Sequence, residues 1–477
     1  MLEAELLRSF PEDVDVPVEA VSMSNARAPR TLIVLDDDPT GTQSVSDVPV
    51  LTRWEPDDIR WALELGRGAV YVLTNTRSLD PAAAAARNRE VVTNALVAAD
   101  GAPLGFVSRS DSTLRGHYPL EPDTIADVLE EHTGVSIDGI VIVPAFPDAG
   151  RVTIGGVHYV RVGSTGELVP ISETEFARDA SFGYASSSLA DYVQEKSNGR
   201  SLAESVVVLD LGVIRSGAAS IADALASVAA RTPIVVDIVT ENDLRGLALG
   251  LAESERRGKH FVYRVGPPFV RARIGQAERA PLTASEIIMA APPSQAGGLI
   301  VVGSHVGLTS RQLAQLLDHD TSATVVELDV RLLMDEGSRK RVIDAAVTRV
   351  VEGLDAGDVV LHTSRELVRS DDPAESLRIA RVVSAALVSA VRRVLGAHAL
   401  RFVIAKGGIT SSDVASDGLS IRRAMVLGPL LPGIVSLWQP AEGPAMGIPY
   451  VVFAGNVGDD RSLWDVVNVL SFPRVLG

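Results

Sequence analysis

The 477-residue chain contains no cysteine. This absence excludes disulfide bonds, thiol catalysis and thiolate metal sites, and it is compatible with a reducing compartment. The first 30 residues carry several acidic side chains and no apolar stretch of the kind that forms a secretory signal. The most apolar long stretch, Ala374–Leu400, is interrupted by arginines, so it predicts an amphipathic core helix and not a membrane span. We therefore predict a soluble, cytoplasmic protein.

Basic residues are also scarce. The chain has 44 Lys and Arg against 61 Asp and Glu, which gives a net charge of −17, and no basic tract interrupts the deficit. Such a chain is not expected to bind nucleic acid or an anionic membrane surface. Any anionic substrate must instead be held by local arginines, lysines or helix N-termini.

Aromatic residues make up only 4% of the chain, whereas hydrophobic residues make up 46%. This mixture favours buried parallel strands covered by helices. The length and the alternation of short apolar runs with helical patterns predict an α/β protein of two domains, each a mainly parallel sheet with flanking helices. The runs predict strands near 31–35, 69–73, 104–107, 139–143, 205–209, 233–237, 260–265, 299–302, 323–328, 357–361, 402–405 and 450–454.

Composition also predicts where the domains begin and end. Residues 289–298 are rich in proline and glycine, which is typical of a linker. We therefore expect an N-terminal extension at 1–30, a first α/β domain at 31–288 and a second α/β domain at 299–477. Within the first domain, glycines and an alternating pattern between Val152 and Ser188 predict a small hairpin inserted at the rim of the sheet.

A strand that ends in three aspartates is the strongest functional signal in the chain. Thr31–Leu35 leads directly into Asp36–Asp38, and Gly41 completes a turn. Ligands of open α/β sheets bind beyond the carboxyl ends of the strands. Three adjacent carboxylates repel one another unless a cation or a proton transfer uses them. We expect an active site at this strand end.

Polar or glycine-rich segments follow several other predicted strands. Arg109–Gly116 holds two arginines, an aspartate and three hydroxyl side chains, a set that suits a polyhydroxylated anion because arginine can hold a carboxylate in a fork. In the second domain, Gly303-Ser304, Gly407-Gly408 and Gly455 each follow an apolar strand. Glycines at such turns let backbone N–H groups approach a phosphate. The sequence has no Walker-type phosphate loop, and its histidines lack metal-ligand spacing.

Together these segments resemble the four-carbon acid sugar kinases, which phosphorylate acids such as threonate, erythronate and 3-oxo-tetronate with ATP. The sequence departs from the family motifs at Asp36 and Thr42, where alanines are usual, and at Ile409, where an acid is common. The matching segments, in the family's order, are Asp36–Thr42, Arg109–Gly116, Pro144–Arg151, Gly156–Tyr159, Gly303-Ser304, Gly407–Thr410 and Gly455–Gly458.

The resemblance implies that 31–288 binds a sugar acid and that 299–477 binds the nucleotide, with ATP and Mg²⁺ as cofactors. Asp37 or Asp38 would be catalytic, orienting the acceptor hydroxyl and accepting its proton. Arg109 or Arg115 would hold the substrate carboxylate. The expected substrate-binding residues are Thr40, Arg109, Asp111, Ser112, Arg115 and Arg151. The expected nucleotide-binding residues are Ser304, Gly407, Gly408, Ile409, Thr410 and Gly455, and no metal ligands are assigned.

Two other functions fit parts of the sequence. In a haloacid-dehalogenase-like phosphotransferase, Asp36 would be the nucleophile and Asp38 the acid/base, with further motifs at Val72–Asn75, Lys406 and Gly458–Asp460. That alternative leaves the Arg109 segment and the glycine turns unexplained. A non-catalytic sugar-acid sensor is the second alternative. The sequence leaves open the sugar acid, the hydroxyl that is phosphorylated, the catalytic base among the three aspartates, the role of residues 1–30 and the oligomeric state, with a homo-oligomer among the options.

Overall fold

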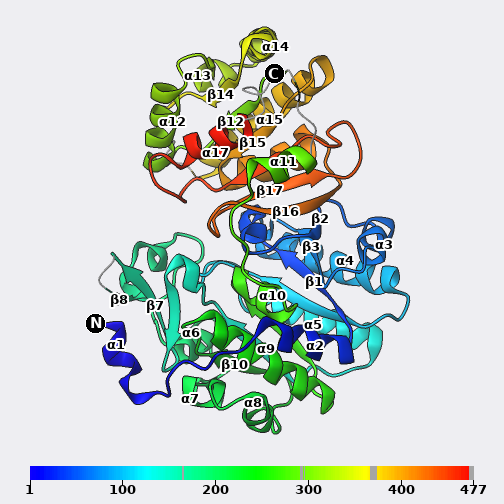
Figure 1. Ribbon diagram of the computed structural model, residues 1–477, viewed down its shortest axis with the longest axis vertical. Coiled ribbons are helices and arrows are strands. Elements are labelled where there is room, and N and C mark those ends of the chain that lie inside the picture. Colours follow the sequence, from blue (N-terminus) through cyan, green and yellow to red (C-terminus); the bar gives the residue numbers. More distant parts are fainter. Residues whose placement is uncertain (164–165, 291–293, 295, 366–372, 472–477) are drawn as a thin grey trace. The chain divides into compact units, whose positions relative to one another are not determined.

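The computed structural model describes residues 1–163, 166–290, 294, 296–365 and 373–471. The chain divides into two compact units (Figure 1), of which the first comprises Met1–Val48 and Trp54–Glu278 and the second comprises Pro49–Arg53 and Arg279–Gly477. Of the linker predicted at 289–298, residues 291–293 and 295 lie outside the described part. Within the described part, no helix is long and apolar enough to cross a membrane.

The first unit is built on a parallel sheet. Its strand order is β3-β1-β4-β11-β5-β10-β9, and each described pairing in it is parallel. Nearly all side chains of these strands are buried, which is the reason that they read as continuous Val- and Ile-rich runs in the sequence. The strands are β1 (Thr31–Asp36), β3 (Ala69–Leu73), β4 (Leu104–Arg109), β5 (Gly139–Val143), β9 (Val207–Leu209), β10 (Thr232–Val236) and β11 (Phe261–Val265).

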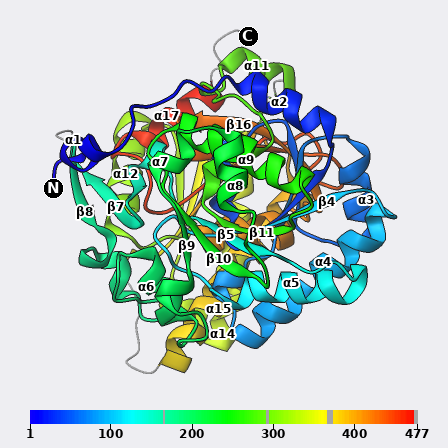
Figure 2. The same ribbon diagram turned by 90° about the horizontal axis from the view of Figure 1, so that it is seen from below.

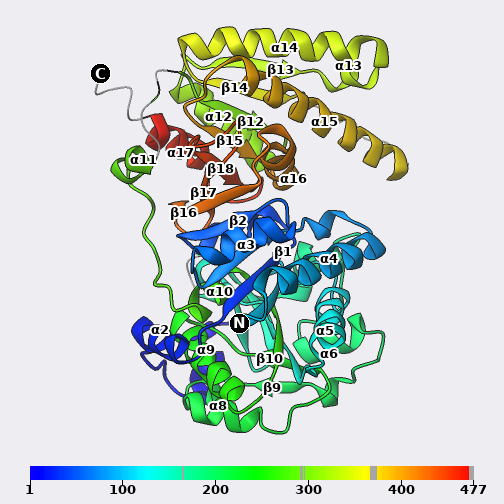
Figure 3. The same ribbon diagram turned by 90° about the vertical axis from the view of Figure 1, so that its right-hand side faces the viewer.

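Helices cover both faces of this sheet. Figures 2 and 3 show α4 (Pro81–Ala99) and α5 (Leu120–Thr133) on one side of the strands and α8 (Ala218–Ala224) and α9 (Glu241–Arg256) on the other. The start of α4 follows the predicted signal, because the Asp80 side chain accepts a hydrogen bond from Ala83 N at 3.0 Å and Pro81 follows the cap. The remaining helices are α1 (Glu3–Leu6), α2 (Val18–Arg27), α3 (Pro56–Glu64), α6 (Leu189–Lys196), α7 (Leu211–Ile214) and α10 (Pro267–Arg273).

The predicted hairpin is present as part of a small antiparallel sheet in the first unit. Its order is β6-β7-β8, with β6 (Arg151–Ile154), β7 (Val157–Val162) and β8 (Glu167–Pro170). The first residues of the chain lie along this sheet, because Glu3 pairs with Arg161 at 2.6 Å and Phe10 packs on its apolar cluster. Residues 1–30 are therefore part of the folded first unit.

The second unit has a mixed sheet. Strands β13-β14-β12-β15-β18 are parallel to one another, and β17 and β16 continue the sheet in antiparallel fashion. Residues 49–51 of β2 (Val48–Leu51) group with this unit beside β16. The other strands are β12 (Leu299–Val302), β13 (Thr324–Leu328), β14 (Val359–Thr363), β15 (Val403–Lys406), β16 (Arg423–Leu431), β17 (Val435–Pro440) and β18 (Tyr450–Phe453).

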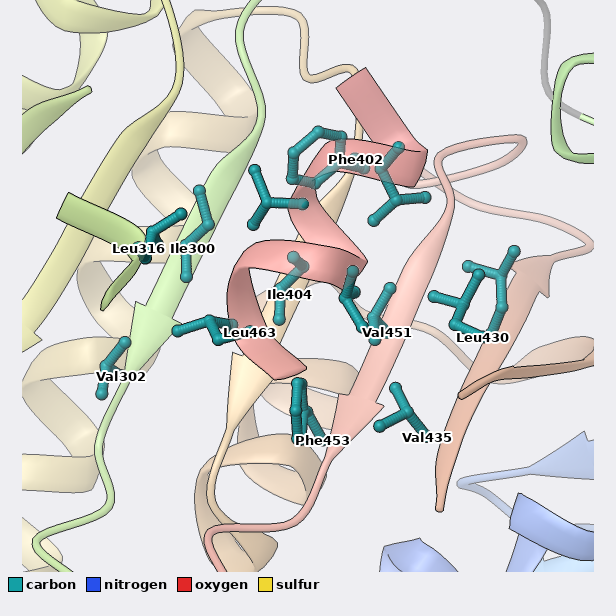
Figure 4. Close-up of a cluster of buried hydrophobic side chains, with 14 of the residues drawn as sticks. Ile300, Val302, Leu316, Phe402, Ile404, Leu430, Val435, Val451, Phe453 and Leu463 are labelled. Atoms are coloured by element: carbon teal, nitrogen blue, oxygen red, sulfur yellow. The ribbon is translucent and has the colours of Figure 1, made fainter. Parts of the chain in front are cut away.

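An apolar core fixes the helices of the second unit on its sheet. Leu316 of α12 (Gly307–His319) and Leu463 of α17 (Ser462–Ser471) pack with Ile300, Ile404 and Val451 of the strands (Figure 4). The stretch predicted as an amphipathic helix forms α15 (Pro373–Ala397), which packs on α14 (Glu336–Ala356). The remaining helices are α11 (Ala284–Ala290), α13 (Val330–Met334) and α16 (Gly408–Asp413). The α/β prediction is thus confirmed, whereas β2, β16 and β17 were not predicted.

Candidate active site

The three aspartates occupy the carboxyl end of β1, in the middle of the first sheet. Asp36 and Asp37 are buried, with side chains only 2% exposed, whereas the side chain of Asp38 is 22% exposed. Asp38 is held by Thr40, whose backbone N and Oγ1 donate to Asp38 Oδ1 at 3.0 Å and 2.6 Å. Of the three carboxylates, Asp38 is therefore the one open to a ligand.

Two arginines from the neighbouring strands neutralise the aspartates. In the sheet, Asp36 is in register with Arg109 of β4, and the Arg109 guanidinium donates to the Asp36 carboxylate. Arg77 lies in the turn after β3 and grips Asp37 in a fork, with Nη2 at 2.6 Å from Oδ1 and Nε at 3.2 Å from Oδ2. Arg77 also lies 3.4 Å from Asp38. Arg77 was not predicted as a site residue, although its position just after a strand next to β1 is a signal that could have identified it.

Burial and charge give the three carboxyls different pKa values. Burial raises the pKa of Asp36 to about 7, against the opposing charge of Arg109. Burial, with the negative charge of Glu121 as a smaller cause, also raises the pKa of Asp37. Burial would raise the pKa of Asp38 as well, but the charges of Arg77 and Arg109 outweigh it and hold that pKa below the usual range. Asp38 is therefore ionised at neutral pH.

Glycines allow the close approach of these groups. A Cβ atom at Gly41 would overlap the Asp36 carboxylate and the Arg109 guanidinium. At Gly116, which has a φ of +121°, a Cβ would lie 2.6 Å from Arg264 Nη2 and 3.0 Å from Asp37 Oδ2. Both glycines of the sequence motifs are thus required for packing against the buried charges.

The Arg109–Gly116 segment is a tight loop whose backbone is held by side chains from later parts of the first unit. Three of its carbonyl oxygens accept hydrogen bonds from buried rings of later elements, at distances of 2.8 to 3.0 Å. The pairs are Ser112 O with His158 Nε2, Thr113 O with Tyr184 OH and Leu114 O with Tyr192 OH. A loop held at three successive carbonyls presents its side chains in one arrangement, which is favourable for binding.

Asp111 and Arg115 form an ion pair within this loop. Arg115 Nε lies 2.6 Å from Asp111 Oδ2, and Thr113 donates to the same carboxylate through its N and Oγ1. These contacts, together with the charge of Arg77, hold the pKa of Asp111 well below its usual range despite burial. Asp111 Oδ2 is 3.9 Å from Arg77, so the loop and the aspartates of β1 belong to one charge cluster.

Arg151 is a cation of a different kind. Its Nη1 donates to Ala149 O at 2.6 Å, its buried Nε has no hydrogen-bond partner among the described residues, and burial lowers its pKa. Arg151 and Arg115 both face the ring of Phe176, at 6.0 Å and 5.5 Å from the ring centroid. No carboxylate of the described chain forms an ion pair with Arg151. By contrast, most buried arginines of this unit pair with carboxylates: Arg109, Arg215, Arg264, Arg271 and Arg273.

A cavity of about 810 Å³ opens beside this cluster in the first unit. It is lined by Arg77 and Gly116 from the site and by His117, Phe182 and Lys196. Ser112, one of the predicted substrate-binding residues, is buried. The contact described for it is the hydrogen bond that its carbonyl oxygen accepts from His158. The first unit therefore offers a polar cavity beside Arg77, the residue that also contacts Asp38.

In the second unit, the glycine turns meet at the carboxyl ends of adjacent strands. Gly303 N and Ser304 N, after β12, donate to Lys406 O of β15 at 3.2 Å and 3.3 Å. Gly407 N, after β15, donates to Phe453 O of β18 at 2.8 Å. These bonds place the three turns side by side, in the same order as the adjacent strands β12, β15 and β18. The first and last of the bonded residues, Gly303 and Phe453, lie 150 positions apart in the sequence.

Side chains at these turns are packed closely. A Cβ atom at Gly455 would overlap the Ser304 side chain, and one at Gly407 would lie 3.1 Å from Thr410 Oγ1. Gly407 also has a φ of +128°, which favours glycine. Ile409, in the first turn of α16, is 62% exposed. The predicted residues Ser304, Gly407, Thr410 and Gly455 are thus contiguous, and their backbone N–H groups lie at one edge of the sheet.

Comparison with known proteins also finds two different domains in the chain. A family described as sugar-binding N-terminal domain matches residues 32–273, and one described as nucleotide-binding C-terminal domain matches residues 299–463. A D-erythronate kinase of Heliobacterium modesticaldum is 29% identical over 297 residues, which cover 61% of this chain and 60% of that protein. A D-threonate kinase of Cupriavidus necator is 29% identical over 415 residues, which cover 84% of this chain and 87% of that protein.

Solved structures share the fold. A Salmonella typhimurium LT2 protein superimposes with a TM-score of 0.66 at 18% identity, covering 91% of this chain and 98% of that one. A Haemophilus influenzae protein gives a TM-score of 0.59 at 17% identity with the same coverage. Since both domain families match in order over nearly the whole chain, the protein belongs to the four-carbon acid sugar kinase family.

Proposed function

We propose that this protein is a kinase that transfers the terminal phosphoryl group of ATP to a hydroxyl group of a four-carbon sugar acid of the erythronate, threonate or oxo-tetronate type. The observation that carries the proposal is the presence in one chain of two complementary sites. The first unit holds a partly exposed carboxylate, Asp38, beside the guanidinium groups of Arg77 and Arg109, and the second unit holds three contiguous glycine turns. The kinase names of two relatives support the reaction type.

In the proposed mechanism, Asp38 orients the acceptor hydroxyl and accepts its proton. Its side chain is the most exposed of the three carboxyls and is ionised at neutral pH. Its low pKa is compatible with this role, because phosphoryl transfer depends more on positioning than on a strong base. Asp37 supports it by holding Arg77, which contacts both carboxylates. Arg109 is proposed to act indirectly, through its ion pair with Asp36, because its side chain is buried against that carboxylate.

Arg151 and Arg115 are proposed to bind the carboxylate of the sugar acid. Arg151 has donor capacity that no described carboxylate uses, and Arg115 lies across the same Phe176 ring. A planar guanidinium can hold a carboxylate through two hydrogen bonds. Thr40, Asp111 and Ser112 remain predicted binding residues for the sugar hydroxyls.

ATP is proposed to bind at Ser304, Gly407 to Thr410 and Gly455. The N–H groups of Ser304 and Gly407 donate to Lys406 O and Phe453 O, so the phosphates are proposed to be approached by the N–H groups of Gly408, Ile409, Thr410 and Gly455. Among the described residues, no group of three or more His, Asp or Glu side chains is arranged to hold a metal ion. We therefore propose that Mg²⁺ arrives with ATP and is held mainly by phosphate oxygens and water, where it neutralises phosphate charge.

The phosphatase-like alternative finds little support in the surroundings of Asp36. A nucleophilic carboxylate must reach the phosphorus atom, but Asp36 is buried and paired with Arg109. Thr74, from the second motif of that alternative, donates to Asp36 O at 2.9 Å. We keep the kinase as the proposed function.

The test is an ATP-consumption screen of the purified protein against four-carbon acids and their oxo forms. Phosphorylated product, identified by ³¹P NMR and mass spectrometry, is expected for at least one acid. Hydrolysis of sugar phosphates without ATP use would favour the phosphatase alternative. Tight binding of a sugar acid without turnover would favour the sensor.

A further inference from the structure

Lys406 is a buried cation at the centre of the glycine turns. Its side chain is 0% exposed, and it is the only fully buried lysine in the described part of the chain. The ammonium donates to Ala454 O at 2.6 Å and lies 3.6 Å from the centroid of the Phe453 ring. No described carboxylate forms an ion pair with it, so its neighbours are a carbonyl dipole and an aromatic face.

Burial of this ammonium is unfavourable for folding. Removal from water lowers the pKa of Lys406 to about 7, and no acidic neighbour offsets the effect. The buried Arg401 of the same unit, by contrast, pairs with Asp358 at 2.5 Å. An apolar side chain of similar length would fill the same space without the desolvation cost. Such an unfavourable group is typical of a functional site.

The position of Lys406 points to that function. Its backbone oxygen accepts the hydrogen bonds of Gly303 N and Ser304 N, and its ammonium binds the carbonyl of Ala454, the residue before Gly455. Gly407 follows it directly in the chain. The ammonium therefore lies at the turn after β18, and the backbone of the same residue joins the turns after β12 and β15.

Arg365, after β14, is a second cation at the same turns. Its Nη1 donates to Ser304 O and its Nη2 donates to Ser310 Oγ, both at 2.6 Å. Its Nε is buried without a partner, and no ion pair joins it to a carboxylate in the described residues. Burial lowers its pKa. Two cations that form no ion pair with a carboxylate of the described residues thus flank Ser304, in a chain whose net charge is −17.

We propose that Lys406 and Arg365 provide the positive charge of the nucleotide site, Lys406 through space from its buried position and Arg365 by direct contact, and that both act on the phosphates and not on the nucleoside. The proposal rests on the nucleotide site proposed above. Because Lys406 is enclosed, it is a positioning residue that makes no contact with the ligand.

The test compares adenosine, AMP, ADP and ATP as calorimetric ligands for the full-length protein. At about pH 6, below the Lys406 pKa of about 7, where the ammonium is mostly protonated, the affinity of Lys406→Met for adenosine should stay the same, and its affinity for ATP should fall about tenfold to a hundredfold, as expected for a unit charge acting at an effective dielectric constant near 20. The loss should grow with the number of phosphates. Arg365→Gln should show the same order. Lys340→Met, which removes an exposed lysine of α14, is the matched control.

Stability provides a readout that separates this role from a structural one. Because the buried charge is unfavourable, Lys406→Met should melt at the parent's temperature or above it. A lower melting temperature or failure to fold, or an equal loss of affinity for adenosine and ATP, would overturn the proposal for Lys406. Unchanged ATP binding in Arg365→Gln would overturn it for Arg365. If the parent protein binds none of the four ligands, the proposed function itself fails.

Discussion

Asp36 should make the stability of the protein fall as the pH rises. Burial places the pKa of Asp36 at about 7 in the folded chain, against about 3.8 for the ordinary side chain. The folded state therefore binds a proton that the unfolded state has released throughout this interval. Stability associated with the protonated form is fully present below pH 3.8 and is lost as the pH rises through about 7. Between about pH 5 and pH 8 the expected loss is roughly 2.5 kcal/mol, at about 1.4 kcal/mol per pH unit of unequal protonation.

The assay is urea unfolding of the parent and of Asp36→Asn at several pH values from about 5 to about 8. The difference between the two proteins cancels the contributions of the titrating groups that do not interact with Asp36. Asp36→Asn should gain roughly 2.5 kcal/mol relative to the parent across this range. Asp47→Asn, which removes a half-exposed partner of Arg67, controls for the loss of a carboxylate. Parallel curves, or a parent that gains stability with pH, would show that Arg109 outweighs burial and would refute the reasoning.

Three further predictions concern the proposed activity and are checked by steady-state kinetics. Asp38→Asn should lower kcat by about 10²- to 10⁴-fold, whereas Asp36→Asn should keep substantial activity; the reverse order would favour an aspartyl-phosphate mechanism. Arg151→Met should raise the KM for the sugar acid about 10- to 100-fold because a charged hydrogen-bond donor is lost, and an unchanged KM would exclude Arg151 from the carboxylate site. Gly455→Ala should raise the KM for ATP about tenfold, since its Cβ would disturb the adjoining turn, and Gly396→Ala, where a Cβ meets open space, is its control; equal KM values for the two would contradict the assignment of the turn.

The strands of both units could be predicted because their residues are buried on both faces. Continuous Val and Ile runs such as 139–143 show no alternation of polar and apolar residues, which is typical of a strand buried on both faces. The structure has strands at all the predicted positions. The β16–β17 pair was missed for the opposite reason. Gly428 and Pro429 interrupt its apolar pattern at the points where the register shifts, so local sequence gives no clear strand signal there.

Within the candidate site, proximity in sequence could be predicted and proximity in space could not. Asp36–Asp38 and Arg109–Gly116 were recognised because each gathers polar groups in one segment. Arg77 stands alone in the sequence, and its importance depends on the pairing of β3 with β1. Lys406 was considered only as part of the phosphatase alternative, because its lack of a counter-ion is a property of the folded core.

The three rings that hold the Ser112–Leu114 carbonyls also determine how a pH–rate profile of this enzyme can be interpreted. Burial raises the pKa values of Tyr184 and Tyr192 far above 10 and lowers the pKa of His158 to about 4. None of the three changes its charge between about pH 5 and about pH 9. These three contacts of the loop are therefore unchanged over that interval. A bend in the rate profile within it does not come from these rings, whereas Asp36 and Lys406, whose pKa values burial places at about 7, do change charge there.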